Sequence, residues 1–273
     1  MDFVIGKNRC PFCDSSDAFH FYGEGKGGFC WSCERSILSD DKKVELQIEE
    51  ENEQEEVVTR EKITPEENEK IKARTSTDGK GYRGIKTATN NFFGVRYEYD
   101  EETGEPVKQF VPTTIAGELS GYRTRTFPKD FSHPIGQVGK ECDMVFQFRF
   151  KTHTGTCIIS GGETKALSTY QMIYDNQAAR GKLDYETTAV VCSTLGESGA
   201  HKQVQAQYEF FNQFKKIIVC MDEDEAGQKA VEQIIKVLPK GKAWVMRMRY
   251  KDADDYVKAG KQQEFIQDFL KAK

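Results

Sequence analysis

Two Cys-x-x-Cys pairs near the start of the chain restrict its fold more than any other feature. Cys10 and Cys13 are separated by sixteen residues from Cys30 and Cys33. Two residues between paired thiolates let both sulfur atoms reach one tetrahedral ion, and the intervening loop brings the second pair round to the same ion. The spacing falls within the four-cysteine zinc pattern of intracellular proteins. The sequence therefore predicts a structural Zn²⁺ site formed by these four cysteines.

The segment that carries these cysteines, residues 1–38, is rich in glycine and aromatic residues, and an alternating run at 18–22 predicts a β-strand. A segment this short buries too little apolar surface to fold alone, so the metal must supply most of its stability. We therefore predict a small β zinc ribbon. His20 is an alternative ligand, but with four thiolates present it is better explained as a strand side chain.

Aromatic and basic residues are interleaved in this zinc segment. The composition suits stacking on bases and contact with the phosphates of a nucleic acid single strand. The same rings are needed to pack the small core, and for each ring taken singly packing is the better explanation. The residues concerned are Phe12, Phe19, Phe21, Tyr22, Phe29 and Trp31, with Lys7, Arg9, Lys26 and Arg35.

An acidic segment at 39–62 follows, with almost no apolar residues. Thirteen acidic and four basic residues lie between Ser39 and Glu69, a net charge of −9. Because the whole chain carries −5, the remaining residues carry +4. Such a segment cannot bury enough surface to offset the entropy of ordering, so we expect a flexible, self-repelling linker. A solvent-exposed helix is the alternative.

The rest of the chain predicts a larger folded core. Thr64, Pro65 and Glu67 form a helix start, with a capping box and proline at the first helical position. Residues 95–111 predict a hairpin around a turn at 100–104. Further on, strands at 156–160, 189–193, 216–221 and 242–247 alternate with helices at 163–174, 199–214, 225–238 and 262–270. This alternation predicts an α/β (α+β) fold with a central, mostly parallel sheet.

Acidic residues follow several of these strands. Asp222 and Asp224 come after the strand at 216–221, and strand alternation would turn both to the same side. Ligands bind at the carboxyl ends of the strands in open α/β sheets, and paired carboxylates suit Mg²⁺ that bridges phosphate oxygens. Charged turns are also common after strands, so this pair alone is weak evidence. Glu163, after a glycine turn, and Asp252, after the last strand, add to the cluster.

Together these motifs resemble the TOPRIM fold, and more closely the primase part of the T-odd bacteriophage primase–helicases. The resemblance runs in order over nearly the whole chain. It rests on the cysteine pairs at 10–33, Arg83-Gly84-Ile85, the basic run at 122–129, Ser193-Thr194-Leu195-Gly196, the acidic strand and helix at 220–232, and Lys251-Asp252-Ala253.

The resemblance implies a DNA primase that copies single-stranded DNA into a short RNA primer from ribonucleoside triphosphates. It implies four regions: a zinc ribbon that reads the template (1–38), a linker (39–62), an N-terminal subdomain of the primase core (63–150) and a TOPRIM subdomain (151–273). Catalytic Mg²⁺, or Mn²⁺ in its place, would be held by Glu163, Asp222 and Asp224. The further catalytic residues would be Asp252, Arg123 and Lys129, with Arg83 and Arg125 on nucleotide and template phosphates.

The resemblance also implies partners: a replicative helicase and a DNA polymerase. No Gly-x-x-x-x-Gly-Lys-Ser/Thr loop occurs, so the helicase would be either fused to this chain or separate. No apolar run approaches the ~18 residues of a membrane span, and the start does not read as a secretory signal. We therefore expect a protein of the cytoplasm, of a bacterial host if it is phage-encoded.

One departure from the family pattern concerns the first acidic motif. Gly161 stands where a glutamate is usual, and Lys165 stands where an aspartate is expected. Either Glu163, two residues on, takes over the acid role, which we favour, or metal binding is weakened. Two other functions stay open: a TOPRIM nuclease or strand-transfer enzyme, for which no catalytic tyrosine module is recognisable, and a DNA-binding replication accessory factor with a decayed catalytic site.

Overall fold

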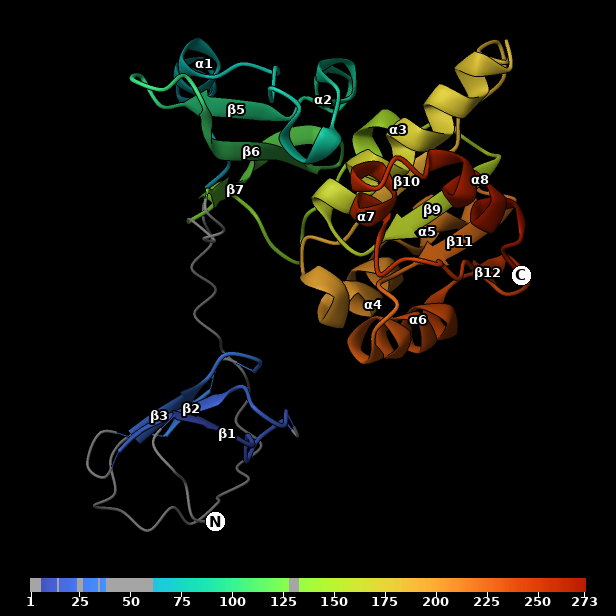
Figure 1. Ribbon diagram of the computed structural model, residues 1–273. Coiled ribbons are helices and arrows are strands. Elements are labelled where there is room, and N and C mark those ends of the chain that lie inside the picture. The colour runs from blue at the N-terminus through green and yellow to red at the C-terminus, as the bar shows by residue number, and fades with distance from the viewer. Residues whose placement is uncertain (1–5, 14, 24–26, 34, 38–60, 128–132) are drawn as a thin grey trace. The chain divides into compact units, whose positions relative to one another are not determined.

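The computed structural model describes residues 6–13, 15–23, 27–33, 35–37, 61–127 and 133–273 (Figure 1). The chain divides into two compact units, Met1–Val57 and Val58–Lys273. The predicted acidic linker lies outside the described residues except for its last two positions, and Lys129 lies outside them as well.

The first unit contains a four-stranded antiparallel sheet in the order β1-β2-β3-β4. The strands are β1 (Gly6–Asn8), β2 (Phe19–Gly23), β3 (Gly27–Cys30) and β4 (Ser36–Ile37). Among the described residues, its small core contains three buried side chains, those of Phe19, Cys10 and Cys30. A Cβ atom on Gly28 would lie 2.5 Å from the Phe19 ring, so β3 approaches the ring this closely only because residue 28 is glycine.

The second unit begins with a helix and an antiparallel sheet in the order β5-β6-β7-β8. The predicted helix start is confirmed, because Thr64 and Glu67 cap each other's backbone at the start of α1. The predicted hairpin is confirmed by the pairing of β5 with β6. The elements are α1 (Pro65–Arg74), the short 3-10 helix η1 (Tyr82–Gly84), α2 (Thr87–Phe93), β5 (Arg96–Tyr99), β6 (Pro106–Ile115), β7 (Glu118–Thr126), β8 (Ile135–Gly136) and η2 (Gln147–Arg149).

A parallel sheet in the order β10-β9-β11-β12 follows, which confirms the predicted alternation. Helices α3, α7 and α8 pack together on one side, and α4 and α6 pack together on the other (Figure 1). The elements are β9 (Thr156–Ser160), α3 (Glu163–Ala179), β10 (Ala189–Cys192), α4 (Gly196–Ala206), α5 (Tyr208–Asn212), β11 (Lys216–Cys220), α6 (Glu225–Val237), β12 (Ala243–Val245), α7 (Ala253–Lys258) and α8 (Gln262–Leu270).

The structure departs from the predicted elements in several places: helix α2 was not predicted, and the strand expected at 242–247 spans only Ala243–Val245. The helix expected at 199–214 is two helices, because the backbone leaves helical geometry at Gln207, whose side chain accepts a hydrogen bond from the Gln147 amide at 3.0 Å. Helix α7 was not predicted; it is short, and the Asp252 side chain caps its N-terminus.

One hydrophobic core joins the two halves of the second unit. Phe93, Tyr97 and Phe150 of the first half are fully buried in the same cluster as Ile158 and Val190 of the parallel sheet. A backbone bridge between Val145 and Cys192 adds a direct link to β10. Within the described part of the chain, no helix is long and apolar enough to cross a bilayer.

Candidate functional site

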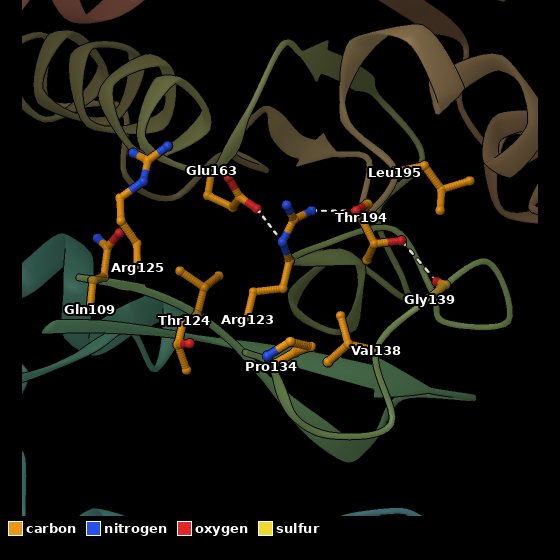
Figure 2. A pocket seen from close by; sticks show the side chains of 11 residues that line it. Gln109, Arg123, Thr124, Arg125, Pro134, Val138, Gly139, Glu163, Thr194 and Leu195 are labelled. Atoms are coloured by element: carbon orange, nitrogen blue, oxygen red, sulfur yellow. Dashed lines mark hydrogen bonds and ion pairs between the residues drawn. The ribbon is translucent and has the colours of Figure 1, made fainter. Parts of the chain in front are cut away.

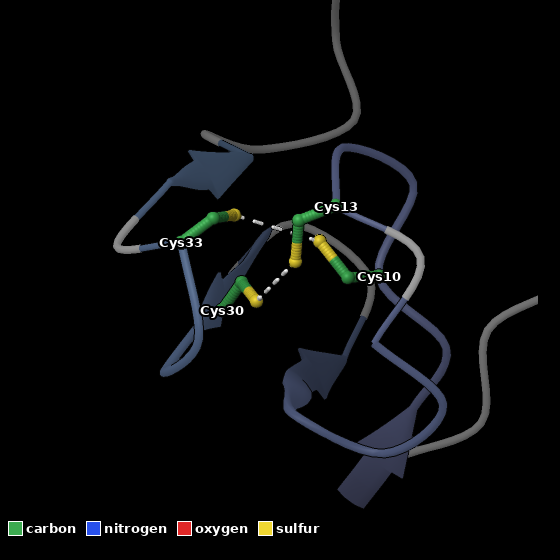
Figure 3. Close-up of side chains that lie close together, drawn as sticks. All are labelled: Cys10, Cys13, Cys30 and Cys33. Atoms are coloured by element: carbon green, nitrogen blue, oxygen red, sulfur yellow. Dashed lines mark hydrogen bonds between the residues drawn. The ribbon is translucent and has the colours of Figure 1, made fainter. Parts of the chain in front are cut away.

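The four cysteines converge in the first unit (Figure 3). The Cys10 and Cys33 sulfur atoms lie 3.7 Å apart, as do those of Cys13 and Cys30, and all four sulfur atoms lie within 4.8 Å of one another. A tetrahedral ion with Zn–S bonds of about 2.3 Å requires sulfur–sulfur distances of about 3.8 Å. The donor set and its spacing therefore fit Zn²⁺.

Backbone amides support this arrangement of sulfur atoms. The N–H of Phe12 donates to Cys10 Sγ at 3.3 Å, and the N–H of Ser32 donates to Cys30 Sγ at 3.4 Å. Each Cys-x-x-Cys turn thus directs an N–H group at its first sulfur, which stabilises the thiolate form that binds metal.

At the carboxyl edge of the parallel sheet, Asp222 lies in an ion-paired cluster with Lys165 and Glu197. The Lys165 ammonium group donates to both oxygens of the buried Asp222 carboxylate, at 2.5 and 2.6 Å. Glu197 Oε1 lies 3.5 Å from the same ammonium nitrogen. Although burial opposes the charge of Lys165, the hydrogen bond and charge of Asp222 outweigh it and raise the pKa of Lys165. Asp222 is therefore neutralised by an internal cation.

Glu197 was not identified from the sequence, although it follows β10 at the same sheet edge as the predicted acids. Burial, and then the negative charge of Asp222, raise the pKa of Glu197 to about 7. Within the described residues, its Oε1 atom is buried and accepts no hydrogen bond. Its position at the start of α4, just after a parallel strand, is the signal that would have identified it.

Asp224 and Asp252 both cap helices at this edge. Strand β11 ends at Cys220, so the expected strand alternation does not extend to residues 222–224. Asp224 accepts a hydrogen bond from the Gly227 N–H at the start of α6, which, with Lys251 3.4 Å away, lowers the pKa of Asp224. Asp252 caps α7, and burial followed by the charge of Asp254 raises its pKa.

Glu163 links this acidic edge to a basic pocket on the antiparallel sheet (Figure 2). Glu163 is the first residue of α3, and its Oε1 atom lies 2.8 Å from Arg123 Nε. Arg123 also donates to the carbonyl oxygens of Ser193 and Thr194. The pocket has a volume of about 310 Å³, and Arg123, Arg125 and Glu163 all line it. β7 thus brings Arg123 and Arg125 to one pocket.

Arg83 lies in the 3-10 helix η1 and is not one of the residues that line this pocket. Its guanidinium group donates to Asp254 Oδ2 at 2.7 Å, and Asp254 is fully buried and also accepts from the Ser168 hydroxyl at 2.7 Å. Arg83 therefore connects the first half of the unit to α3 and α7. Its contact with phosphates stays a prediction, as does the role of Lys129.

The acidic edge offers oxygen donors of the kind that Mg²⁺ prefers, and Glu197 Oε1, which accepts no hydrogen bond within the described residues and lies 3.5 Å from Lys165, is one of them. Among the residues that the structure describes, however, only the four cysteines form a set of three or more donors within 4.8 Å. Asp222, Asp224 and Glu163 are each engaged with a basic side chain instead. The carboxylate oxygens of the acidic edge are therefore suitable ligands for Mg²⁺, and in this structure lysine and arginine side chains pair with them.

Comparisons with known proteins agree with this fold. Residues 159–257 match the family described as Toprim-like. The "DNA helicase/primase" of Enterobacteria phage T3 is 47% identical over 66 residues, which cover 24% of this chain and only 12% of that protein.

Two solved structures from bacteriophage T7 are similar. The primase fragment of the T7 primase–helicase covers 97% of this chain and 99% of its own, with 24% identity and a TM-score of 0.62. A chain from a complex of the T7 lagging-strand DNA polymerase with the primase domains of two gp4 subunits, bound to an RNA/DNA hybrid and dTTP, covers 68% of this chain and 87% of its own, with 27% identity and a TM-score of 0.57. These findings confirm the resemblance to the primase part of the T-odd bacteriophage primase–helicases, with a Toprim-like domain at 159–257.

Proposed function

We propose that the chain is a DNA primase that makes short RNA primers on single-stranded DNA by Mg²⁺-dependent nucleotidyl transfer. The observation that carries the proposal is the adjacency of a basic pocket and an acidic sheet edge, joined through the Arg123–Glu163 ion pair. Transfer of a nucleotidyl group needs mainly positioning and neutralisation of phosphate charge, which these two features supply. The T7 complex, whose chain is 27% identical, contains an RNA/DNA hybrid and dTTP, which supports this class of ligand.

Arg123, Arg125 and Lys129 are proposed to contact the triphosphate and the template backbone. Arg123 is already oriented by two backbone carbonyl oxygens, so its guanidinium group loses little freedom when a phosphate binds. When triphosphate and template are bound, Glu163 would release Arg123 and contact a metal ion or a substrate hydroxyl group instead. Arg83 is proposed to act mainly by holding the fold around the pocket.

Asp222, Asp224 and Glu163 are proposed to hold Mg²⁺, with Asp252 at the rim. When bound, the metal neutralises triphosphate charge and helps to activate the primer 3′-hydroxyl group. The N-cap position of Asp224 fixes one of its oxygens and leaves the other, now 3.4 Å from the exposed Lys251 ammonium, to face a ligand. Mn²⁺ is expected to substitute for Mg²⁺.

The zinc module, residues 1–38, is proposed to read the template sequence. Trp31 is 70% exposed and Tyr22 is 45% exposed, so these two rings are available for stacking on bases. The proposed partners are a replicative helicase and a DNA polymerase. The helicase is supported by the similar helicase/primase of phage T3, and the polymerase is supported by the similar T7 chain from a complex with a DNA polymerase. We expect these partners in the cytoplasm of a bacterial host.

Template-dependent incorporation of labelled ribonucleotides on single-stranded DNA tests the proposal. Short RNA products that require both Mg²⁺ and template would support a primase. Cleavage of the template would instead favour a TOPRIM nuclease. Template binding without either reaction would favour the accessory-factor alternative, for which the Lys165–Asp222 pair is the specific observation.

A further inference from the structure

Glu197 occupies space that a side chain at position 161 would need. A Cβ atom on Gly161 would overlap Glu197 Oε1 and would lie 3.2 Å from Asp222 Oδ1. Glu197 is the second residue of α4, the helix after β10, whereas Gly161 follows β9, the neighbouring strand in the sheet. The absence of a side chain at 161 therefore allows the Glu197 carboxylate to reach past the end of β9 toward Asp222, which follows β11 on the other side of β9.

Lys165 completes the cluster from the first turn of α3. It is the third residue of that helix and lies four residues after Gly161 in the chain. Its side chain is about four-fifths buried, and its ammonium nitrogen lies within 3.5 Å of both the Asp222 and Glu197 carboxylates. The charge of Asp252 also acts on Lys165, and the charge of Asp224 also acts on Glu197, so several carboxylates surround this lysine.

We propose that Glu197 supplies the carboxylate that position 161 lacks, and that the Lys165 ammonium group takes the place of a cation beside it. A divalent ion would then bind between Asp222 and Glu197 only after Lys165 withdraws from them. Lys165 thus acts as a built-in competitor that weakens metal binding until substrate arrives. This inference rests on the proposed Mg²⁺ site and adds Glu197 and Lys165 to it.

Three features support the exchange of lysine for a metal ion. A lysine ammonium group and a divalent metal ion can each pair with carboxylate oxygens, and the Lys165 ammonium group already contacts both oxygens of Asp222. A lysine side chain is long and flexible enough to move away without a change in the backbone. The Glu197 Oε1 atom accepts no hydrogen bond within the described residues and lies 3.5 Å from the Lys165 ammonium nitrogen, so a cation that came closer would add a direct contact.

Mn²⁺ binding to the zinc-loaded full chain, measured by electron paramagnetic resonance without nucleotide, tests the role of Lys165. We expect Lys165→Gln to tighten Mn²⁺ binding about tenfold, because the competing positive charge is gone. Lys229→Gln removes an exposed lysine on α6 and is the matched control, for which we expect no change. Binding by Lys165→Gln that equals or falls below that of the unmodified protein would overturn the proposal.

A second pair of variants tests Glu197 without any change of charge and guards against misfolding of the lysine variant. Gly161→Ala places a methyl group where Glu197 Oε1 now lies, so Mn²⁺ affinity should fall several-fold. Gly162→Ala is the control, because a Cβ there meets nothing within 4 Å. Equal affinities for the two alanine variants would exclude Glu197 from the site, as would an undiminished gain in the Lys165→Gln/Glu197→Gln double variant.

These binding measurements separate the inference from the proposed function. If primer synthesis is absent but the Mn²⁺ affinities follow the expected order, the primase proposal fails and the metal site stands. If primers are made but neither Lys165→Gln nor Gly161→Ala changes Mn²⁺ affinity, the primase proposal stands and this inference fails. Failure to detect Mn²⁺ binding in any variant also overturns the inference.

Discussion

The Arg83 guanidinium group lies 2.7 Å from Asp254, a carboxylate with no exposure to solvent. We expect Arg83→Met to lower the free energy of unfolding by about 3 kcal/mol, because among the described residues it leaves the buried Asp254 charge with the Ser168 hydroxyl as its remaining side-chain donor. Urea unfolding followed by circular dichroism measures this difference.

The exposed ion pair between Lys86 and Asp175, 2.6 Å long, provides the control for Arg83. It also joins the first half of the unit to α3, but both side chains are well exposed, so Lys86→Met should cost less than about 1 kcal/mol. Equal losses for the two variants would show that Arg83 has no special structural role, and phosphate contact would then be its better explanation.

The sequence predicted several helices and strands of the second unit, but it did not predict the Arg83–Asp254 ion pair. Hydrophobic periodicity and capping residues predicted α1, the β5–β6 hairpin and the parallel strands, because these depend on residues close together in the chain. The Arg83–Asp254 contact joins residues 171 positions apart, and local patterns carry no information on such pairs.

The candidate site was predicted to a similar extent. The acids that follow strands could be placed at one sheet edge from topology alone, and Glu197 obeyed the same rule although it was not singled out. No sequence pattern indicated which basic side chain pairs with each acidic residue. The pairing of Asp222 with Lys165 depends on α3 turning its first turn toward the end of β11.

Removal of zinc should unfold the first unit and leave the second folded. Among the described residues of the first unit, the buried core is Phe19 with two of the metal-binding cysteines, whereas the second unit has an extensive core of its own. Chelation followed by limited proteolysis should leave a resistant fragment that starts near residue 60. Simultaneous loss of both units would contradict the separation into two units.

Asp222→Asn and Asp224→Asn should each abolish Mg²⁺-dependent primer synthesis but differ in stability. The Asp222→Asn change would remove the carboxylate nearest to the Lys165 ammonium group and leave Glu197 at 3.5 Å, so we expect a loss of about 1–3 kcal/mol. Asparagine is as good an N-cap as aspartate, so Asp224→Asn should change stability by less than about 0.5 kcal/mol. Full activity of either variant would remove that residue from the proposed metal site.

Glu163→Gln tests whether the acid beside Arg123 is essential. If Glu163 holds metal, the variant should lose primer synthesis by a factor of about 100 or more at saturating nucleotide. If Glu163 only positions Arg123, the main effect should be a higher KM for the nucleotide with kcat nearly unchanged. Steady-state kinetics over a range of nucleotide concentrations distinguishes these outcomes, and wild-type values for both constants would show that neither role is needed.

Division of the chain after Val57 tests whether the zinc module reads the template. The second unit retains the acidic edge and the basic pocket, so it should still make dinucleotides. Priming at selected sites on longer templates should be lost, because covalent attachment gives the zinc module an effective concentration of about a millimolar, far above what is supplied in trans. Adding the zinc-loaded first unit at about 1 μM should therefore restore little. If the second unit alone primes at the same template sites with the same efficiency as the whole chain, the zinc module is not the template reader.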